Sequence, residues 1–213
     1  MYIPQLHEET DLTVLHAWMR LHPLGTWATQ GEGELIVNHV PFLLDATRGP
    51  YGTLLCHVAR ANSVWQSFSK TVPSVIVFQG PDTYISPSWY PSKQLHGKVV
   101  PTWNYAVVHA HGIPVLMQTQ AQLMQQITQL TATHEGNQAI PWQVADAPAD
   151  FVEQMSRQIV GIEIPITRIF GKWKVSQNRS AADRSGVVAG LKVSAVPESV
   201  QMADLVDRAT TRG

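Results

Sequence analysis

The sequence has little from which a covalent or metal-based framework could be built. Among its 213 residues Cys56 is the only cysteine, which excludes an internal disulfide and a cysteine-rich zinc site. Lysine and arginine total 15 against 16 acidic residues, and this formal net charge of −1 disfavours a protein held on nucleic acid by bulk electrostatics. No apolar run approaches the roughly 18 residues of a membrane span, and the opening residues lack the pattern of a signal peptide. We therefore expect a soluble, cytoplasmic protein with no membrane partner.

The common catalytic and nucleotide-binding motifs are also missing. The chain contains no GxGxxG, GxxxxGK[ST], HExxH or GxSxG, so a Rossmann dinucleotide site has no support. Cys56 and His57 are adjacent, but neighbours on a strand point to opposite faces, which disfavours a catalytic dyad. His109 and His111 share a face of a predicted strand, yet no third ligand is evident, and we expect no metal site. No catalytic residue can be assigned.

Local patterns predict mainly antiparallel β structure, with the longer helices late in the chain. Hydrophobic residues make up 44% of the sequence and charged residues 15%, enough for a buried core. The run 75–78 is apolar throughout, as in a strand buried on both faces, whereas 79–93 is too rich in proline, serine and glycine to be regular throughout. Strands are expected at residues 23–29 and 35–44, which form a hairpin, and at 53–58, 75–78, 100–117 and 162–166. Helices are expected at 11–22, 118–131 and 148–160, within 59–68, and after Ser180.

Three blocks are polar and aromatic where a core strand should be apolar. In the first, residues 57–65, Arg60 offers a fork for phosphate oxygens and Asn62 a further donor. The alternative for this block is an ordinary arginine on a strand-to-helix turn. The other two, 80–90 and 100–105, carry aromatic faces and hydroxyl or amide groups suited to a flat heterocycle. Taken singly, either of these blocks is better explained as an aromatic cluster that caps the barrel end.

The chain resembles the PaiB-type proteins in the segments HVARANSVW, FQGPDTYISPSWY, VVPTWNY and GKWKVSQNRS, with MYIP at the start and NHVPFLL. That family is grouped with the FMN-binding split barrels related to pyridoxamine 5′-phosphate oxidase. The resemblance implies a mainly β fold with added helices, a six-stranded antiparallel FMN-binding split β-barrel, over residues 1–191. A helical C-terminal tail over 192–213 is expected to follow. The resemblance further implies a homodimer with the flavin between subunits.

The resemblance also implies which residues hold FMN. In related barrels a turn after a strand grips the phosphate, the preceding strand lies along the ring, and later segments close the ring or ribityl side. The block 171–179 adds positive charge for the phosphate or the subunit contact, unless it is a solvated edge strand with protective lysines. The expected cofactor contacts are His39, Val40, His57, Arg60, Asn62, Ser86, Trp89, Thr102, Trp103, Asn104, Lys172 and Gln177.

Two functions remain open at this point. One is a flavin-dependent oxidoreductase, in which FMN accepts hydride or electrons. The alternative is a PaiB-type transcriptional regulator acting in negative regulation of gene expression, directly or indirectly. Residues 168–192 hold six basic side chains against Asp183 alone, but no helix-turn-helix is evident, and Gly186 and Gly190 weaken a recognition helix. DNA is therefore the less favoured partner. Haem binding is a third option that rests only on nine histidines.

Overall fold

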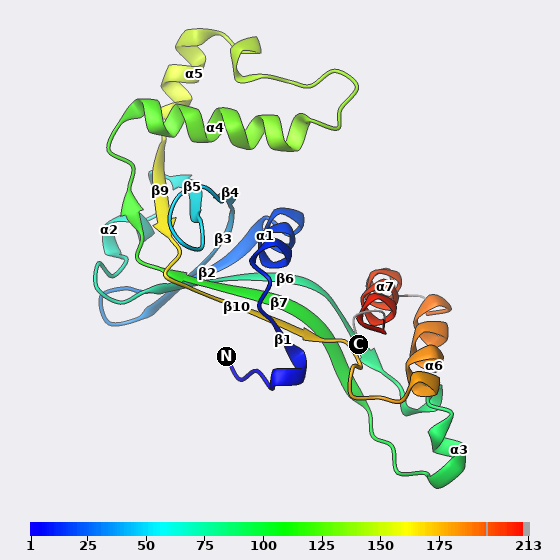
Figure 1. Ribbon diagram of the computed structural model, residues 1–213. Coiled ribbons are helices and arrows are strands. Elements are labelled where there is room, and N and C mark those ends of the chain that lie inside the picture. Colours follow the sequence, from blue (N-terminus) through cyan, green and yellow to red (C-terminus); the bar gives the residue numbers. More distant parts are fainter. Residues whose placement is uncertain (195, 211–213) are drawn as a thin grey trace. The chain divides into compact units, whose positions relative to one another are not determined.

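The computed structural model describes residues 1–194 and 196–210. The chain forms two compact units, each of which is described by itself. Figure 1 labels their helices and strands. Unit 1 consists of Met1–Leu15, Gln79–Val108 and Phe170–Gly213, and unit 2 of His16–Phe78 and His109–Ile169. Three strands run on from one unit into the other: β6 (Ser74–Ile85), β7 (Thr102–Gly112) and β10 (Arg168–Lys174).

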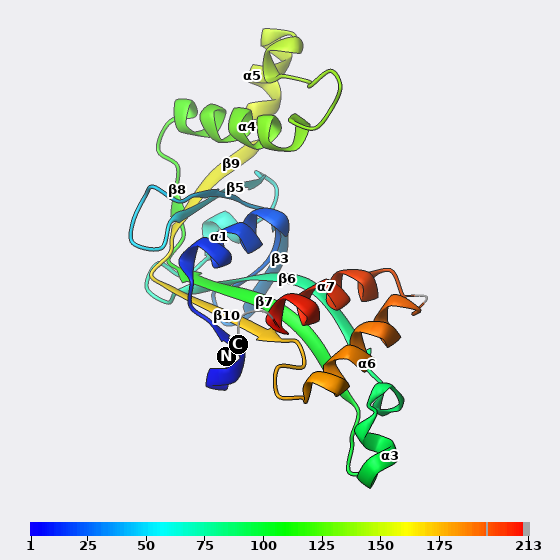
Figure 2. The ribbon, with the colours of Figure 1, turned by 45° about the vertical axis from the view of Figure 1, so that its right-hand side comes forward.

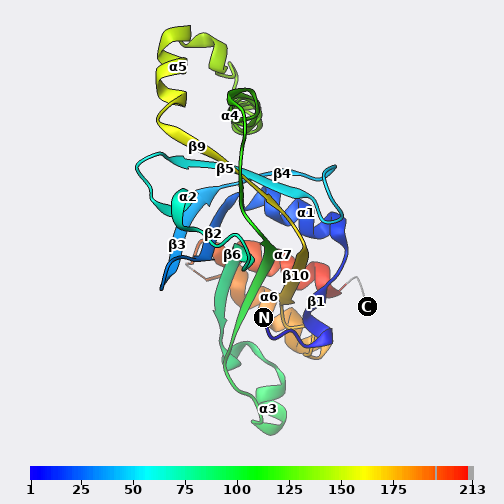
Figure 3. The same cartoon turned by 90° about the vertical axis from the view of Figure 1, so that its left-hand side faces the viewer.

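Unit 2 is built on antiparallel strands. The predicted hairpin is present as β2 (Leu24–Gln30) and β3 (Leu35–Pro41) (Figure 3). In its register Thr26 lies opposite His39. β2 also pairs with β6, where Thr26 lies opposite Val77. A second sheet has the order β4-β5-β9-β8, and in it His57 lies opposite Gly161. Its strands are β4 (Leu43–Asp45), β5 (Thr53–Ala59), β9 (Ile159–Pro165) and β8 (Val115–Leu116).

The period of two along these strands separates a core face from an outer face. Trp27, Ile76 and Phe78 are fully buried on the core face. Val75 and Val77 alternate with them and are only half-buried. In a single chain the run 75–78 is thus fully buried on one face only, and its other face, formed by Val75 and Val77, is half-buried.

Helices cover part of unit 2. α1 (Leu12–Leu21) begins in unit 1 at the predicted place and ends before Pro23. α4 (Gln120–Glu135) starts with a capping box between Thr119 and Gln122. α5 (Ala149–Ser156) is shorter than predicted, because the strand β9 begins at Ile159 and takes the last residues of the expected helix. The remaining helical pieces are α2 (Val64–Ser67) and the 3₁₀ turn η3 (Val144–Asp146).

In unit 1 the strand order is β1-β10-β7-β6, with β1 (Glu8–Glu9) pairing antiparallel with β10. As predicted, the segment 79–93 is not regular throughout, but its first part is, because β6 runs on to Ile85. Pro81, Thr83 and Ile85 are buried while Tyr84 between them is exposed, so the alternation of a strand continues past the proline. The other elements are η1 (Gln5–His7), η2 (Pro87–Trp89), α3 (Ser92–His96), α6 (Ala181–Lys192) and α7 (Glu198–Thr210).

The helices α6 and α7 lie side by side and cover a buried cluster of unit 1 (Figure 2). Trp89 packs against α6 where the helix has no side chain. A Cβ added at Gly190 would lie 2.4 Å from Cδ2 of Trp89, and one added at Gly186 would lie 2.0 Å from its main-chain oxygen. The two glycines thus allow a close approach rather than merely weakening the helix. The cluster consists of Ile85, Tyr90, Val175, Val187, Leu191, Met202, Ala203 and Val206.

The predicted class, a mainly β fold of antiparallel strands with added helices, is confirmed. The described residues contain ten strands, more than the six expected. The expected division at residue 191 stays a prediction, and the part of the 192–213 tail at Ala195 and beyond Thr210 lies outside the described residues. None of the helices described here has the length and apolar character needed to cross a membrane.

Candidate flavin site

The turn after β5 contacts the hairpin strand β3. Asn62 donates through Nδ2 to Oδ1 of Asn38 at 2.8 Å, and its Oδ1 accepts from the backbone N–H of Val64 at 3.0 Å. The second bond satisfies a free main-chain donor at the start of α2. Two segments expected to hold flavin, the strand carrying His39 and the turn carrying Asn62, therefore lie side by side.

Arg60 directly follows β5 and is anchored by two main-chain oxygens near the start of β9. Its Nε donates to the carbonyl of Arg157 at 2.7 Å and its Nη2 to that of Ile159 at 3.0 Å. The guanidinium carbon lies 5.8 Å from the ring centroid of Trp65. Within the described part of the chain no carboxylate forms an ion pair with Arg60. Its charge is held in place without being neutralised, and N–H groups of the guanidinium remain for a further acceptor.

His57 lies on the face of β5 that α4 covers. Its Nδ1 is 2.9 Å from Oε1 of Gln126, a residue that is only 1% exposed. The ring itself is half-buried. Arg60 and Asn62 follow within five residues, so the three predicted phosphate contacts occupy one short segment, with His57 anchored to a helix and Arg60 to a strand.

His39 and Val40 point to opposite faces of β3. Val40 is buried in the core, whereas His39 is exposed on the outer face beside Thr26 of β2. This outer sheet face is apolar and uncovered in a single chain: the exposed fractions are 61% for Leu24, 71% for Leu35 and 56% for Val37. Val75 and Val77 of β6 continue it.

In unit 1 the start of β7 is fastened to the end of β10. Lys174 donates from Nζ to Oγ1 of Thr102 and, at 2.7 Å, to the carbonyl of Trp103. Asn104 is only 1% exposed and donates from Nδ2 to Oγ of Ser176 at 2.9 Å. Ser176 has a φ of 65°, in the left-handed region. Thr102 and Asn104 thus both link the start of β7 to the end of β10 and the residues that follow it.

Lys172 is buried rather than solvated. It is 8% exposed, lies 5.7 Å and 5.1 Å from the ring centroids of Tyr2 and Tyr105, and donates to the carbonyl of Tyr2 at 3.0 Å. Because β10 lies between β1 and β7, the alternative of a solvated edge strand is wrong. Oε1 of Gln177 lies at hydrogen-bonding distance, 3.1 Å, from Nδ1 of His7. Burial, and then the neighbouring lysine charges, lower the pKa of His7.

The aromatic block around Trp103 is more open. Trp103 is 50% exposed, donates from Nε1 to Oδ1 of Asp82 at 2.9 Å, and meets the Tyr84 ring edge-on at 6.2 Å between centroids. Ser86 caps η2 by accepting from the backbone N–H of Ser88. Trp89 has one ring face against Gly190. Of the residues predicted in unit 1, Trp103 has the most exposed ring.

Comparisons with known proteins identify the family. A family model described as "Putative FMN-binding domain" matches residues 1–168. The chain belongs to this FMN-binding domain family. It is 32% identical to an uncharacterised protein of Aspergillus fumigatus, covering 90% of this chain and 91% of that one. It is 29% identical, over 97% of each chain, to the Bacillus subtilis protein named Protease synthase and sporulation protein PAI 2.

A solved structure shows the same fold. The FAD and haem binding protein from Mycobacterium smegmatis aligns with a TM-score of 0.57 at 13% identity, over 79% of this chain and 73% of that chain. The fold of this FMN-binding domain protein is thus the split β-barrel, and the resemblance to PaiB-type split-barrel proteins is confirmed. α6 and α7 lie beyond the segment that the family model matches.

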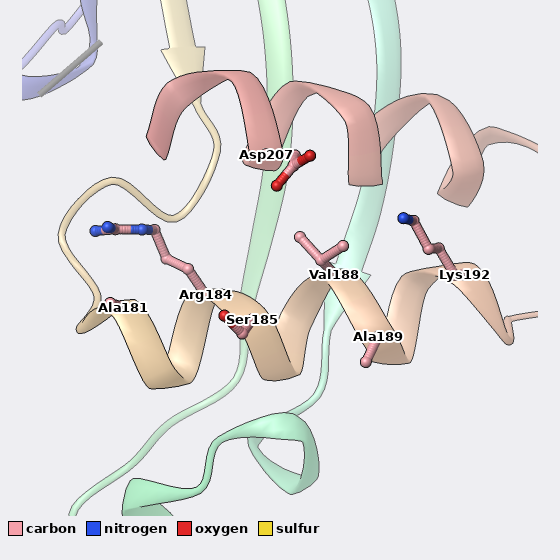
Figure 4. Close-up of a pocket in the computed structure, with 7 residues that line it drawn as sticks. All are labelled: Ala181, Arg184, Ser185, Val188, Ala189, Lys192 and Asp207. Atoms are coloured by element: carbon pink, nitrogen blue, oxygen red, sulfur yellow. The ribbon is translucent and has the colours of Figure 1, made fainter. Parts of the chain in front are cut away.

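A pocket of about 330 Å³ lies between α6 and α7 of the FMN-binding domain protein (Figure 4). Figure 4 shows Arg184 and Lys192 toward its two ends and Asp207 facing it from α7. Its lining contains none of the residues predicted to bind flavin. The lining residues are Ala181, Arg184, Ser185, Val188, Ala189, Lys192 and Asp207.

The other reactive side chains of this family member are poorly placed for chemistry. Burial lowers the pKa of His109 to about 4 and also lowers the pKa of His111. Within residues 1–194 and 196–210 no three metal-binding side chains gather, so the structure offers no metal site there. Cys56 is buried in the core, and burial raises the pKa of its thiol.

Sequence reasoning missed Asn38, Gln126 and Ser176. Asn38 lies within the quoted segment NHVPFLL and faces the same turn as Asn62. Gln126 lies in a helix with four other glutamines. The sequence pattern alone assigns all of them to the solvent-exposed side. No local signal marks Ser176 as a left-handed residue, because glycine and asparagine are the usual occupants of that region.

Proposed function

We propose that this chain is an FMN-binding protein that works as a homodimer, with FMN serving as an electron or hydride carrier. The observation that carries the proposal is the match of residues 1–168 to the FMN-binding domain. The contact between Asn62 and Asn38 supports it, because it joins the expected phosphate turn to the expected ring strand. When bound, FMN would supply the redox chemistry, and the chain would bind, orient and shield it.

Arg60 is the best candidate to hold the phosphate. A guanidinium fixed by two carbonyls and lacking a carboxylate partner keeps its geometry when an anion arrives, so little side-chain entropy is lost on binding. Asn62 would add a donor and His57 lies three residues before Arg60 on the same segment. Lys172 is a weaker candidate, since Tyr2 and Tyr105 already surround its ammonium group.

The outer sheet face supports a homodimer. Leu24, Leu35 and Val37 expose apolar surface on adjacent strands, and contiguous patches of this kind on soluble proteins mark interaction sites. A second copy meeting this face would also cover His39, so part of the flavin environment would come from the interface. Within unit 1, Ser86, Trp89, Thr102, Trp103, Asn104 and Gln177 stay candidates for contacts to a flavin ring or ribityl chain, and Trp103 has the most exposed ring of this set.

Titration with FMN and with riboflavin tests the phosphate grip. We expect FMN to bind well and riboflavin poorly. Arg60→Ala should cost about 1.5–3 kcal/mol of FMN affinity, the range of a hydrogen bond to a charged group. Arg60→Lys is the matched control, because it keeps the charge and loses the fork. Circular dichroism must confirm that the Arg60→Ala fold survives the loss of the bonds to Arg157 and Ile159. Equal FMN affinity in wild type and Arg60→Ala would refute this placement of the phosphate.

Light scattering at micromolar concentration tests the homodimer. The expected mass is twice the 23.6 kDa of one chain. Val37→Lys should shift the population toward single chains, since it places a charge in the middle of the outer sheet face. Thr128→Lys on the exposed face of α4 is the control and should leave the mass unchanged. A wild-type protein found only as single chains contradicts the homodimer.

The regulatory alternative rests on the Bacillus subtilis relative, whose printed name refers to protease synthesis and sporulation. The basic stretch that would meet DNA is largely engaged within the chain: Lys172 is buried, and Lys174 donates to Thr102 and Trp103. We therefore expect no sequence-specific duplex binding at physiological salt, with or without FMN. A nanomolar, salt-sensitive complex that Lys172→Ala with Lys174→Ala abolishes would overturn this expectation.

A further inference from the structure

One helix–strand contact in unit 2 joins two polar side chains in otherwise apolar surroundings. His57 on β5 lies opposite Gly161 on β9, and both face α4. A Cβ at Gly161 would lie 2.4 Å from Sδ of Met117 and 3.2 Å from Cδ1 of Leu123, so those side chains fill the place above the glycine. Gln126 comes three residues after Leu123 on α4 and takes the place above His57.

The contact fixes one ring nitrogen of His57 and leaves the other available. Nδ1 lies 2.9 Å from Oε1 of Gln126. Since an amide oxygen can only accept, Nδ1 must carry the proton in this arrangement. No partner for Nε2 of His57 is present among the described residues. Nε2 is therefore the nitrogen left to accept a hydrogen bond from a donor group of a ligand.

The contact carries a cost to stability. Nε2 of Gln126 is buried and has no partner among residues 1–194 and 196–210. A buried donor without a partner destabilises a fold, and an apolar side chain of similar size would remove that penalty. Among the described residues, the one hydrogen bond that the Gln126 side chain makes is the bond to His57, which points to a role exercised through that ring.

We infer that Gln126 is a positioning residue for the flavin site: it holds His57 in the Nδ1–H tautomer so that Nε2 faces the bound cofactor. This inference rests on the proposed function in so far as the ligand is FMN. The statement about the tautomer depends on the chain alone. The two parts can be measured separately.

Nitrogen-15 NMR of the imidazole rings tests the tautomer without flavin, with the His57 signals assigned by their loss in His57→Asn. Wild type should show the Nδ1–H form. Gln126→Glu should keep it, because a carboxylate also accepts, and Gln126→Met should shift it toward the Nε2–H form that free histidine prefers. Gln125→Met, an exposed neighbour on α4, is the control and should change nothing. A wild-type Nε2–H form, or a tautomer unaffected by Gln126→Met, overturns the inference.

FMN titration tests the consequence for the ligand. Gln126→Met should weaken FMN binding about 3- to 10-fold, as expected for one hydrogen bond, while the protein unfolds at the same urea concentration as wild type or a higher one. A merely structural glutamine would give the reverse, lower stability with unchanged affinity, and that result would overturn the positioning role. If wild type binds no flavin, the proposed function fails, and the tautomer measurement still decides whether Gln126 orders His57.

Discussion

Alanine substitution at Gly186 and Gly190 probes how closely Trp89 approaches α6. In an exposed helix this change stabilises by about 1 kcal/mol, because alanine has the higher helix propensity. Here the new methyl groups meet Trp89. At Gly190 the Cβ would lie 2.4 Å from the indole, a side chain that can shift, and at Gly186 it would lie 2.0 Å from a main-chain oxygen. Overpacking costs about 1–3 kcal/mol, and more where the backbone must move.

The expected outcome is an order of effects. We expect a net loss of about 1 kcal/mol for Gly190→Ala and about 2–3 kcal/mol for Gly186→Ala, after the gain in propensity is subtracted. Urea unfolding followed by circular dichroism measures both. Trp89→Ala removes the indole but not the main-chain oxygen. In that background Gly190→Ala should become neutral or stabilising, while Gly186→Ala should stay destabilising. Equal effects of Gly190→Ala in the two backgrounds would refute the packing argument.

Three further predictions follow from single contacts. Burial, with a smaller effect of His111, lowers the pKa of His109 from 6.5 to about 4. Between these pH values the unfolded chain binds a proton that the folded chain does not. The free energy of unfolding should therefore fall as the pH drops from 6.5 to 4. Partial exposure limits this loss to about 1–2 kcal/mol, and His109→Gln should flatten the pH dependence of the urea midpoint. Cys56 is buried, and burial raises the pKa of its thiol. A thiol reagent should therefore label Cys56 in urea but not in buffer at pH 8. Fast labelling of the native protein would contradict the position of Cys56 in the core. Arg48 forms two hydrogen bonds to Glu163, at 3.0 and 2.5 Å, and the arginine side chain is 45% exposed. Arg48→Ala should therefore lower the free energy of unfolding by only about 0.5–1 kcal/mol, and by less in high salt. A decrease that salt leaves unchanged would argue against an exposed ion pair.

Local patterns were sufficient where neighbouring residues decide the structure. The hairpin around Gly31–Glu34 and the alternation of Ile162, Ile164 and Ile166 were predicted because turn residues and a period of two act over a few positions. The continuation of β6 through Pro81 was not predicted, because composition was given more weight than the buried alternation of Thr83 and Ile85.

The candidate site depended more on tertiary contacts. The pattern of α4 favours an exposed Gln126, yet the residue is buried because His57 on a distant strand offers it a partner. A lysine at position 172 is expected at the surface from its residue type. Its burial depends on the rings of Tyr2 and Tyr105, which lie far from it in the sequence. Arg60 was selected by its chemistry, but only the structure shows which of its donors are already engaged. Pairings of this kind are set by the fold and leave no local pattern in the sequence.

The outer sheet face of β2 and β3 has a consequence for temperature. Contact between apolar surfaces is driven near room temperature by the entropy of water, and this driving force weakens on cooling. If the proposed homodimer forms through Leu24, Leu35 and Val37, it should therefore loosen in the cold and tighten on mild warming. Storage on ice would then favour single chains with a bare apolar face, and precipitation at low temperature would reflect that exposed sheet rather than unfolding.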